Sequence, residues 1–232
     1  IHVRVDGDVA GAPTVVLLHQ MVWSSVQFRN VQPILARKGV RSIAVDIPGY
    51  GLSDGPTFVP TAAQYAETLL PVLDRFKIAR AILHGNHTGA TLIAAFADAH
   101  PDRVDRLIIQ GPPLFDAATQ QKLIDEKPYD QTPRADGSHI VGRWQQGAQG
   151  FGAKTSLASQ QEGLVQFFTA GPAEWYAHDA VYRFDLAPVL ARLKVPALIL
   201  TSPGDSLHRG SLELKAMRPD FDLAQTNWPG AH

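Results

Sequence analysis

The stretch that decides the fold reads AILHGNHTGA and occupies residues 81–90. The apolar residues 81–83 lead through His84 into Gly85, His87 follows, and Gly89 comes two residues later. The small and apolar residues 90–95 then predict a helix. Two flanking glycines permit a sharp turn without Cβ collisions, so we expect His87 to be held in a strained conformation with its side chain exposed. The N–H groups at the start of the helix point at the same spot and favour a developing anion there.

Short apolar runs alternate with longer amphipathic runs on both sides of this turn. The runs that predict buried strands are 14–18, 41–45, 80–84, 106–109 and 197–201, with a weaker one near 221–226. The helical patterns between them cover 26–37, 61–76 (with Thr61 as its N-cap), 88–100 and 186–193. Residues 2–5 alternate polar and apolar, which is typical of an antiparallel edge strand. The alternation predicts an α/β fold with a mostly parallel sheet and helices on both faces.

The stretch 114–184 breaks this rhythm, because it holds glutamine clusters, glycines and many aromatic residues but no strand–helix repeat. We interpret it as an inserted helical lid over the carboxyl edge of the sheet, where open α/β folds bind ligands. The alternative is a second packing layer without ligand contact. The lid interpretation divides the chain into a first core part (1–113), a lid (114–184) and a second core part (185–232).

Composition narrows the classes of partner and cofactor. The 232 residues carry 21 Lys and Arg against 22 Asp and Glu, a net charge of −1, so no basic surplus favours nucleic acid. The absence of cysteine excludes disulfides, thiolate metal sites and cysteine nucleophiles. No apolar run approaches the ~18 residues of a membrane span. We therefore expect a cytoplasmic protein without a membrane or nucleic-acid partner that acts on a small molecule.

The turn at 85–89 resembles the nucleophile elbow of the α/β-hydrolase family, and the resemblance extends along nearly the whole chain. Further matching segments are LLHQ at 17–20, DIPGYGLSD at 46–54, AHPDRV at 99–104, VPALIL at 195–200 followed by Gly204 and Asp205, and PGAH at 229–232. The resemblance implies an α/β-hydrolase fold and the chain order elbow, acid, histidine. It also implies a closing helix after the position of His232, so we expect both ends of this chain to be shorter than in the family.

The elbow position departs from the family pattern, since His87 stands where Ser, Asp or Cys is usual. The resemblance assigns Asp205 as the acid that orients His232, which then acts as an acid–base. Three roles are open for His87: a nucleophile that forms an acyl-imidazole, a base that activates water or removes a proton from carbon, and an inert residue in a binding site. Neighbouring imidazoles repel when both are charged, which favours a neutral base near pH 7.

The resemblance also implies an oxyanion hole, formed by the backbone N–H groups of Thr88 and Met21. Gln20 replaces the usual Gly beside Met21, a change that keeps the backbone donor. The residues that we expect to line the substrate pocket are His19, Gln20, Trp23, Trp144 and Trp228. Their aromatic content favours an apolar or aromatic substrate, although aromatic residues are equally expected in a core.

Other polar residues have two interpretations each. His87, His232 and Asp205 are a residue set that binds iron or zinc, but no H-x-H or H-E-x-x-H spacing occurs, so we expect no metal and no cofactor. Ser24 and Ser25 are candidates for a substitute nucleophile, with helix capping as the simpler role. Arg143 and Arg183 are candidates for binding a substrate carboxylate, with surface placement as the default.

The sequence therefore predicts a cofactor-independent hydrolase of an ester, a lactone or a related carbonyl compound. Two alternatives use the same pocket. One is a lyase or isomerase that works by proton abstraction, and the other is a small-molecule binding protein on a hydrolase scaffold.

Overall fold

The computed structural model describes residues 1–7, 11–150 and 156–227. Its centre is a seven-stranded sheet with the strand order β1-β3-β2-β4-β5-β6-β7. The strands are β1 (Val3–Asp6), β2 (Thr14–Leu18), β3 (Arg41–Val45), β4 (Ala81–Asn86), β5 (Val104–Gln110), β6 (Ala197–Thr201) and β7 (Asp222–Gln225). Only β1 runs antiparallel, paired with β3, and the other described neighbours are parallel. The predicted fold class and the antiparallel edge strand are confirmed.

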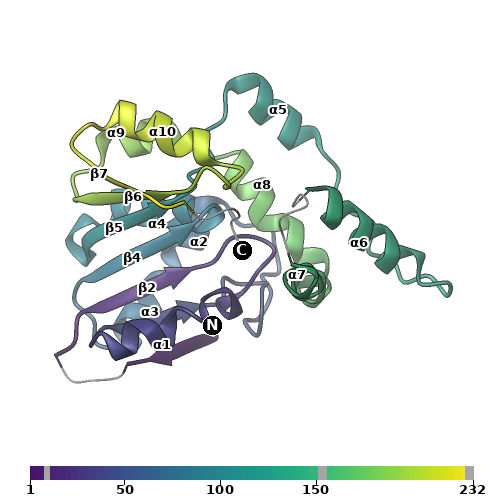
Figure 1. The fold of residues 1–232 in the computed structure, drawn as a ribbon, viewed down its shortest axis with the longest axis horizontal. Coiled ribbons are helices and arrows are strands. Elements are labelled where there is room, and N and C mark those ends of the chain that lie inside the picture. The colour runs from purple at the N-terminus through teal and green to yellow at the C-terminus, as the bar shows by residue number, and fades with distance from the viewer. Residues whose placement is uncertain (8–10, 151–155, 228–232) are drawn as a thin grey trace.

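Helices follow most of the parallel strands (Figure 1). The α-helices are α1 (Gln32–Arg37), α2 (Ala62–Glu67), α3 (Leu69–Arg75), α4 (Thr88–Ala99), α5 (Ala117–Asp125), α6 (Ser138–Gly150), α7 (Leu157–Ala170), α8 (Tyr176–Tyr182), α9 (Leu186–Arg192) and α10 (His208–Met217). Three 3-10 turns, η1 (Ser25–Phe28), η2 (Pro101–Arg103) and η3 (Gly171–Trp175), complete the regular structure of the described residues.

The two faces of the sheet are covered unequally. Alternate residues of a strand point to opposite faces, so Val16 and Leu18 of β2 join one core while Val15 and Leu17 join another. The first core is large and includes the buried face of α4, whose residues 88–97 are all buried. The second is a small cluster in which Phe28 of η1 is the largest buried side chain. The large core therefore anchors β4 and α4, the two elements that meet at His87.

Three local features differ from the sequence-based expectation. The helix predicted at 26–37 is split into η1 and α1, because Pro33 has no N–H and fits only in the first turn of a helix. The pattern at 61–76 forms α2 and α3, which meet at Thr68. Helix α10 was not predicted. Thr61 does cap α2, and it forms a capping box with Gln64.

The inserted stretch 114–184 contains α5, α6, α7, η3 and α8, and the described residues in it form no strand. Figure 1 shows α6 reaching away from the sheet. The stretch contacts the core through Tyr50, whose hydroxyl donates to the carbonyl of Glu174 at 2.6 Å. Its role as a lid stays a prediction. None of the helices in the described ranges has both the length and the apolar character needed to span a bilayer.

Candidate active site

His87 lies at the sharp turn between β4 and α4, with φ 49° and ψ −106°. A Cβ atom on Gly85 would collide with the carbonyl group of Gly89, and one on Gly89 would collide with the backbone of Leu18. The backbone of His87 is fixed from both sides, because its N–H donates to the carbonyl of Gln110 at 2.9 Å and its carbonyl accepts from Ala90 at 2.9 Å. The turn therefore needs both glycines for steric reasons and holds His87 in a backbone conformation that is costly for a side chain.

The side chain of His87 meets the acid that the sequence analysis selected. Its Nε2 lies 2.8 Å from Oδ1 of Asp205, in the turn after β6. The same carboxylate oxygen accepts the backbone N–H of Leu207 at 2.8 Å. Because the carboxylate is an acceptor, Nε2 is the donor in this contact, and in the neutral form of the ring Nδ1 then keeps its lone pair. No hydrogen bond joins Nδ1 to any described residue, and 17% of the His87 side chain is exposed. The pair thus presents one basic nitrogen.

Gly111 supplies the space in which this pair forms. It follows β5 and has φ +55°, and a Cβ atom added to it would lie 2.5 Å from Cδ2 and 2.7 Å from Nε2 of His87. The same atom would lie 3.0 Å from Oδ2 of Asp205. A residue with a side chain at 111 is therefore incompatible with the observed pair. Gly111 was not among the predicted site residues, and its only signal in the sequence was a glycine two residues after the predicted strand 106–109.

Two backbone N–H groups meet the requirements of the predicted oxyanion donors. Thr88 is the first residue of α4, so its N–H has no partner within the helix. Met21 lies in the loop after β2, and neither N–H group donates to another described residue. The neighbouring N–H of Gln20 is already used, since it donates to the Gln27 side chain at 3.0 Å. The structure leaves both predicted donors available, and their role stays a prediction.

His19 and Gln20, which we expected to line the pocket, are almost completely buried. His19 donates from Nδ1 to the carbonyl of Gln20 at 2.9 Å and accepts the N–H of Ile47 at Nε2. Burial lowers the pKa of His19 to about 4, so its ring is neutral at pH 7. The side chain of Gln20 accepts a hydrogen bond from Asn86 at 3.1 Å. Both ring nitrogens of His19 are therefore hydrogen-bonded to the backbone of the protein.

The structure describes two of the three predicted pocket tryptophans and does not describe the third or His232. Trp23 is buried and lines a large cavity, whereas Trp144 on α6 lines a small one together with Val22. Trp228 and His232 lie outside the described residues. Their predicted roles in the pocket and in acid–base chemistry stay predictions.

The large cavity measures about 600 Å³ and lies over the less covered face of the sheet. Its apolar wall comes from alternate residues of the central strands, including Leu17, Ile82, Ile108 and Leu200. At the carboxyl edge it reaches Asp205, but His87 is not among its lining residues. The cavity therefore approaches the His87–Asp205 pair from the side of the acid.

The remaining polar candidates have protein partners. The guanidinium of Arg143 lies 4.1 Å from the centre of the Phe167 ring, and burial lowers its pKa. Arg183 pairs with Asp179 at 2.8 Å. Ser24 accepts the N–H of Val26, so the predicted capping role is confirmed. Within the described ranges, no three histidine, aspartate or glutamate side chains gather in a group that suits a metal ion.

Comparison with known proteins places this geometry in a family. A family model described as the alpha/beta hydrolase fold matches residues 13–144, more than half of the chain. The chain belongs to the α/β-hydrolase fold family. The seven-stranded sheet is thus this chain's version of that fold.

Curated relatives of this family member match less than half of it. It is 38% identical over 108 residues to a 2-hydroxy-6-oxononadienedioate/2-hydroxy-6-oxononatrienedioate hydrolase from Cupriavidus pinatubonensis, covering 44% of the chain and 37% of the relative. It is 32% identical over 108 residues to a haloalkane dehalogenase from Mycobacterium marinum, covering 45% of the chain and 36% of the relative. The chain spans about two fifths of the length of these relatives.

Solved structures agree over almost the whole chain. A hydrolase from Oleispira antarctica superposes with a TM-score of 0.78 at 20% identity, covering 97% of this chain and 85% of the other. The enol-lactonase from Burkholderia xenovorans gives a TM-score of 0.69 at 24% identity and covers 97% of this chain and 87% of the other. At these identities the agreement shows the fold.

Proposed function

We propose that this protein is a cofactor-independent hydrolase of an ester, a lactone or a related carbonyl compound, with His87 as its general base. The observation that carries the proposal is the His87–Asp205 pair at the N-terminus of α4, which engages Nε2 of His87 and leaves Nδ1 without a hydrogen bond to any described residue. A histidine of this kind is the commonest general base at physiological pH. Two relatives named for an oxo compound and an enol-lactone support a carbonyl substrate.

In the proposed reaction, Nδ1 takes a proton from a water molecule as the water oxygen attacks the carbonyl carbon. The carbonyl oxygen becomes negative and accepts hydrogen bonds from the N–H groups of Met21 and Thr88. The positive end of the α4 dipole also stabilises this negative oxygen. The bond to the leaving group then breaks, and the proton passes to the leaving oxygen. Asp205 stabilises the transient imidazolium. His232 keeps its sequence-based role as a second acid–base in this proposal.

The geometry favours a base over a nucleophile. The Asp205 carboxylate holds Nε2 of His87 and so fixes the orientation of the ring, as an acid partner does for a histidine base. The same base is suited to proton removal from carbon, so a lyase or isomerase reaction would use the same residues. Trp23, in the loop after β2, and Trp144, beside Val22 of the same loop, support an apolar or aromatic substrate.

The test compares the wild-type protein with His87→Ala and His100→Ala on activated esters, lactones and epoxides. We expect His87→Ala to lose ~10²–10⁴-fold in turnover, the usual contribution of a general base. His100 is a suitable control because it pairs with Glu67 on another part of the surface. Full activity of His87→Ala would contradict the proposed role of His87.

Labelled water and mass spectrometry distinguish the remaining alternatives. Hydrolysis places the oxygen of labelled water in the product, whereas an uncleaved rearranged product indicates an isomerase and binding without turnover indicates a binding protein. An acyl adduct on His87 would replace the base role with a nucleophilic one. A serine-directed organophosphate should label His87→Ser and leave the wild-type protein unlabelled. Labelling of Ser24 or Ser25 in the wild-type protein would contradict the assignment.

A further inference from the structure

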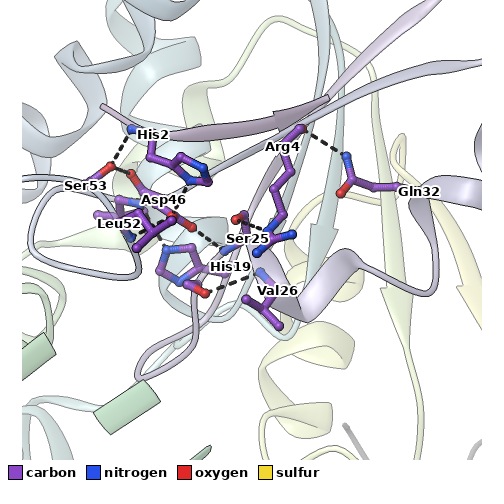
Figure 2. A network of polar contacts seen from close by, with 11 residues as sticks. His2, Arg4, His19, Ser25, Val26, Gln32, Asp46, Leu52 and Ser53 are labelled. Carbon is purple, nitrogen blue, oxygen red and sulfur yellow. Dashed lines mark hydrogen bonds and ion pairs between the residues drawn. The ribbon is translucent and has the colours of Figure 1, made fainter. Parts of the chain in front are cut away.

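A second buried carboxylate lies at the carboxyl end of β3, next to the oxyanion loop, which we define as residues 19–25. Asp46 is 1% exposed and accepts three hydrogen bonds on its side chain. Its Oδ1 accepts the N–H of Ser25 at 2.6 Å, and its Oδ2 accepts the N–H of Leu52 at 2.9 Å and Nδ1 of His2 at 2.7 Å. Figure 2 shows these donors converging on Asp46 from three separate segments.

The carboxylate has no room to leave this position. Gly51 packs against it so closely that a Cβ atom there would overlap Oδ2. Burial raises the pKa of Asp46, but the hydrogen bonds from Leu52, Ser25 and His2 together lower it below its ordinary value. Asp46 is therefore a charged acceptor at neutral pH, and hydrogen bonds to a charged acceptor are the stronger kind.

Asp46 and Ile47 form hydrogen bonds to the two ends of the oxyanion loop. Asp46 binds the N–H of Ser25 at the end of the loop. At the beginning of the loop, the N–H of Ile47 donates to Nε2 of His19 at 3.0 Å. The neutral ring of His19 then donates from Nδ1 to the carbonyl of Gln20, directly before Met21. The predicted donor Met21 thus lies between two anchored points.

We propose that Asp46 is a positioning residue that sets the shape of the oxyanion loop and so aims the Met21 N–H at the reacting carbonyl. This inference rests on the proposed function, because it assigns Met21 the role of an oxyanion donor. Asp46 cannot reach a substrate itself, since its side chain is buried and its oxygens are occupied by Ser25, Leu52 and His2. It acts through the backbone to which it is bonded.

The test is Asp46→Asn, which keeps the size of the side chain but replaces one acceptor oxygen with an NH₂ donor. The amide cannot accept from Ser25, Leu52 and His2 at once without turning its NH₂ group towards an N–H. We expect amide hydrogen exchange in residues 20–25 to become at least ~10-fold faster as these hydrogen bonds open, while exchange in β4 stays unchanged. Asp54→Asn is the matched control, because Asp54 is an exposed carboxylate in the same 46–54 segment.

The kinetic arm separates positioning from a purely structural role. Loss of an oxyanion donor costs ~10²–10³-fold in kcat, so a displaced donor should cost at least ~10-fold. We expect this loss in kcat with little change in KM, because the donor acts on charge that develops in the transition state. Unchanged exchange in the loop would contradict the inference, and so would faster exchange with wild-type kcat. Inactivity of the wild-type protein would instead contradict the proposed function, and the exchange measurement would still decide whether Asp46 orders the loop.

A second pair of variants is available if Asp46→Asn does not fold. Ser25→Pro removes the N–H that Asp46 binds, at the first position of η1, where proline is tolerated. Ser25→Ala keeps that N–H and removes the hydroxyl, which is bonded to Arg4 and also contacts Asp46 and is missing from Ser25→Pro as well, so the two variants differ in the N–H. Faster exchange of residues 20–24 and lower kcat in Ser25→Pro than in Ser25→Ala support the inference. Equal behaviour of the two variants contradicts it.

Discussion

Among the described residues, two His–Asp pairs have nearly the same contact distance, one at the carboxyl end of β4 and one at the carboxyl end of β3. The His87–Asp205 pair has a distance of 2.8 Å and the His2–Asp46 pair one of 2.7 Å. In both, the aspartate is buried and the histidine is partly exposed. The chemistry of the two contacts is therefore the same, and their surroundings differ.

The difference lies in what surrounds each pair. Asp46 also accepts the backbone N–H groups of Ser25 and Leu52, so its pair connects separate segments of the chain. His87 lies at the start of α4, beside an N–H that has no acceptor among the described residues, and its backbone is strained. A His–Asp contact is thus not by itself a catalytic feature. Both histidines use a single ring nitrogen in their pair, so the backbone N–H at the start of α4 is what makes the His87 pair the better candidate for catalysis.

The largest expected effect on this comparison comes from Gly111→Ala. The added Cβ would overlap the His87 ring, separate it from Asp205 and leave the His2–Asp46 pair untouched. Misplacement of a catalytic group by about 1 Å costs ~10²-fold, so we expect a loss of that size in kcat/KM. Steady-state kinetics on the best ester or lactone measures it.

Gly137→Ala is the control for the backbone cost of this change. Gly137 also has a positive φ, +70°, but a Cβ there would meet nothing within 4 Å. Both variants should lose ~1 kcal/mol of unfolding free energy from the strained backbone, with a further loss in Gly111→Ala from the overlap. Full activity of Gly111→Ala would show that the observed His87–Asp205 contact is not needed.

The second prediction concerns acid stability and the Asp46 pair. The pKa of Asp46 is lowered in the folded state, so its contribution to stability is present above its ordinary pKa of ~3.9 and is lost as pH falls through the folded value. At pH 7, Asp46→Asn should lower the unfolding free energy by ~1.5–3 kcal/mol, the range for hydrogen bonds to a charged group. Urea unfolding at pH 7, 5, 4 and 3 should show this difference shrinking below pH 4.

Asp54→Asn serves as the control at each pH. Its side chain is exposed, so it should show no comparable loss at pH 7 and no convergence in acid. A difference between wild-type protein and Asp46→Asn that stays constant down to pH 3 would contradict the proposed charge state of Asp46.

The smallest expected effect is that of His2→Ala. The His2 side chain is 32% exposed and supplies one of three donors to Asp46, so solvent screens the contact. We expect the unfolding free energy to fall by less than ~1 kcal/mol. His100→Ala, which removes a surface His–Glu contact of 2.8 Å, is the matched comparison. A loss in His2→Ala as large as that in Asp46→Asn would make His2, and not the backbone donors, the main partner of Asp46.

Part of the fold and of the site could be predicted because the signals are local. The strands at 14–18, 41–45 and 197–201 were predicted with their observed bounds, since buried parallel strands are short continuous apolar runs. The turn at His87 was predicted from the two glycines that flank it, which is also a local signal. The split of residues 26–37 into η1 and α1 was missed, because apolar spacing alone does not locate the start that Pro33 imposes.

The sequence predicted less well which side chains contact one another at the candidate site. The structure shows Asp205 bonded to His87, a contact that no local pattern predicted, while the pairing of Asp205 with His232 that the resemblance implies involves a residue outside the described ranges and stays a prediction. His19 was expected in the pocket and is fully buried, with both ring nitrogens bonded. Gly111 and the donors of Asp46 gave no pattern, since their partners are far away along the chain.

The sequence by itself determined the order of strands and helices and the sharp turn that exposes His87, because apolar periodicity and glycine act within a few residues. The tertiary structure decided which carboxylate meets which histidine, and which loop each carboxylate holds. Residues 2, 25, 46 and 52 come together only when β1, β3 and η1 are packed. Hydrogen bonds between such distant residues depend on distances of a few tenths of an ångström, and only the packed sheet and helices fix those distances.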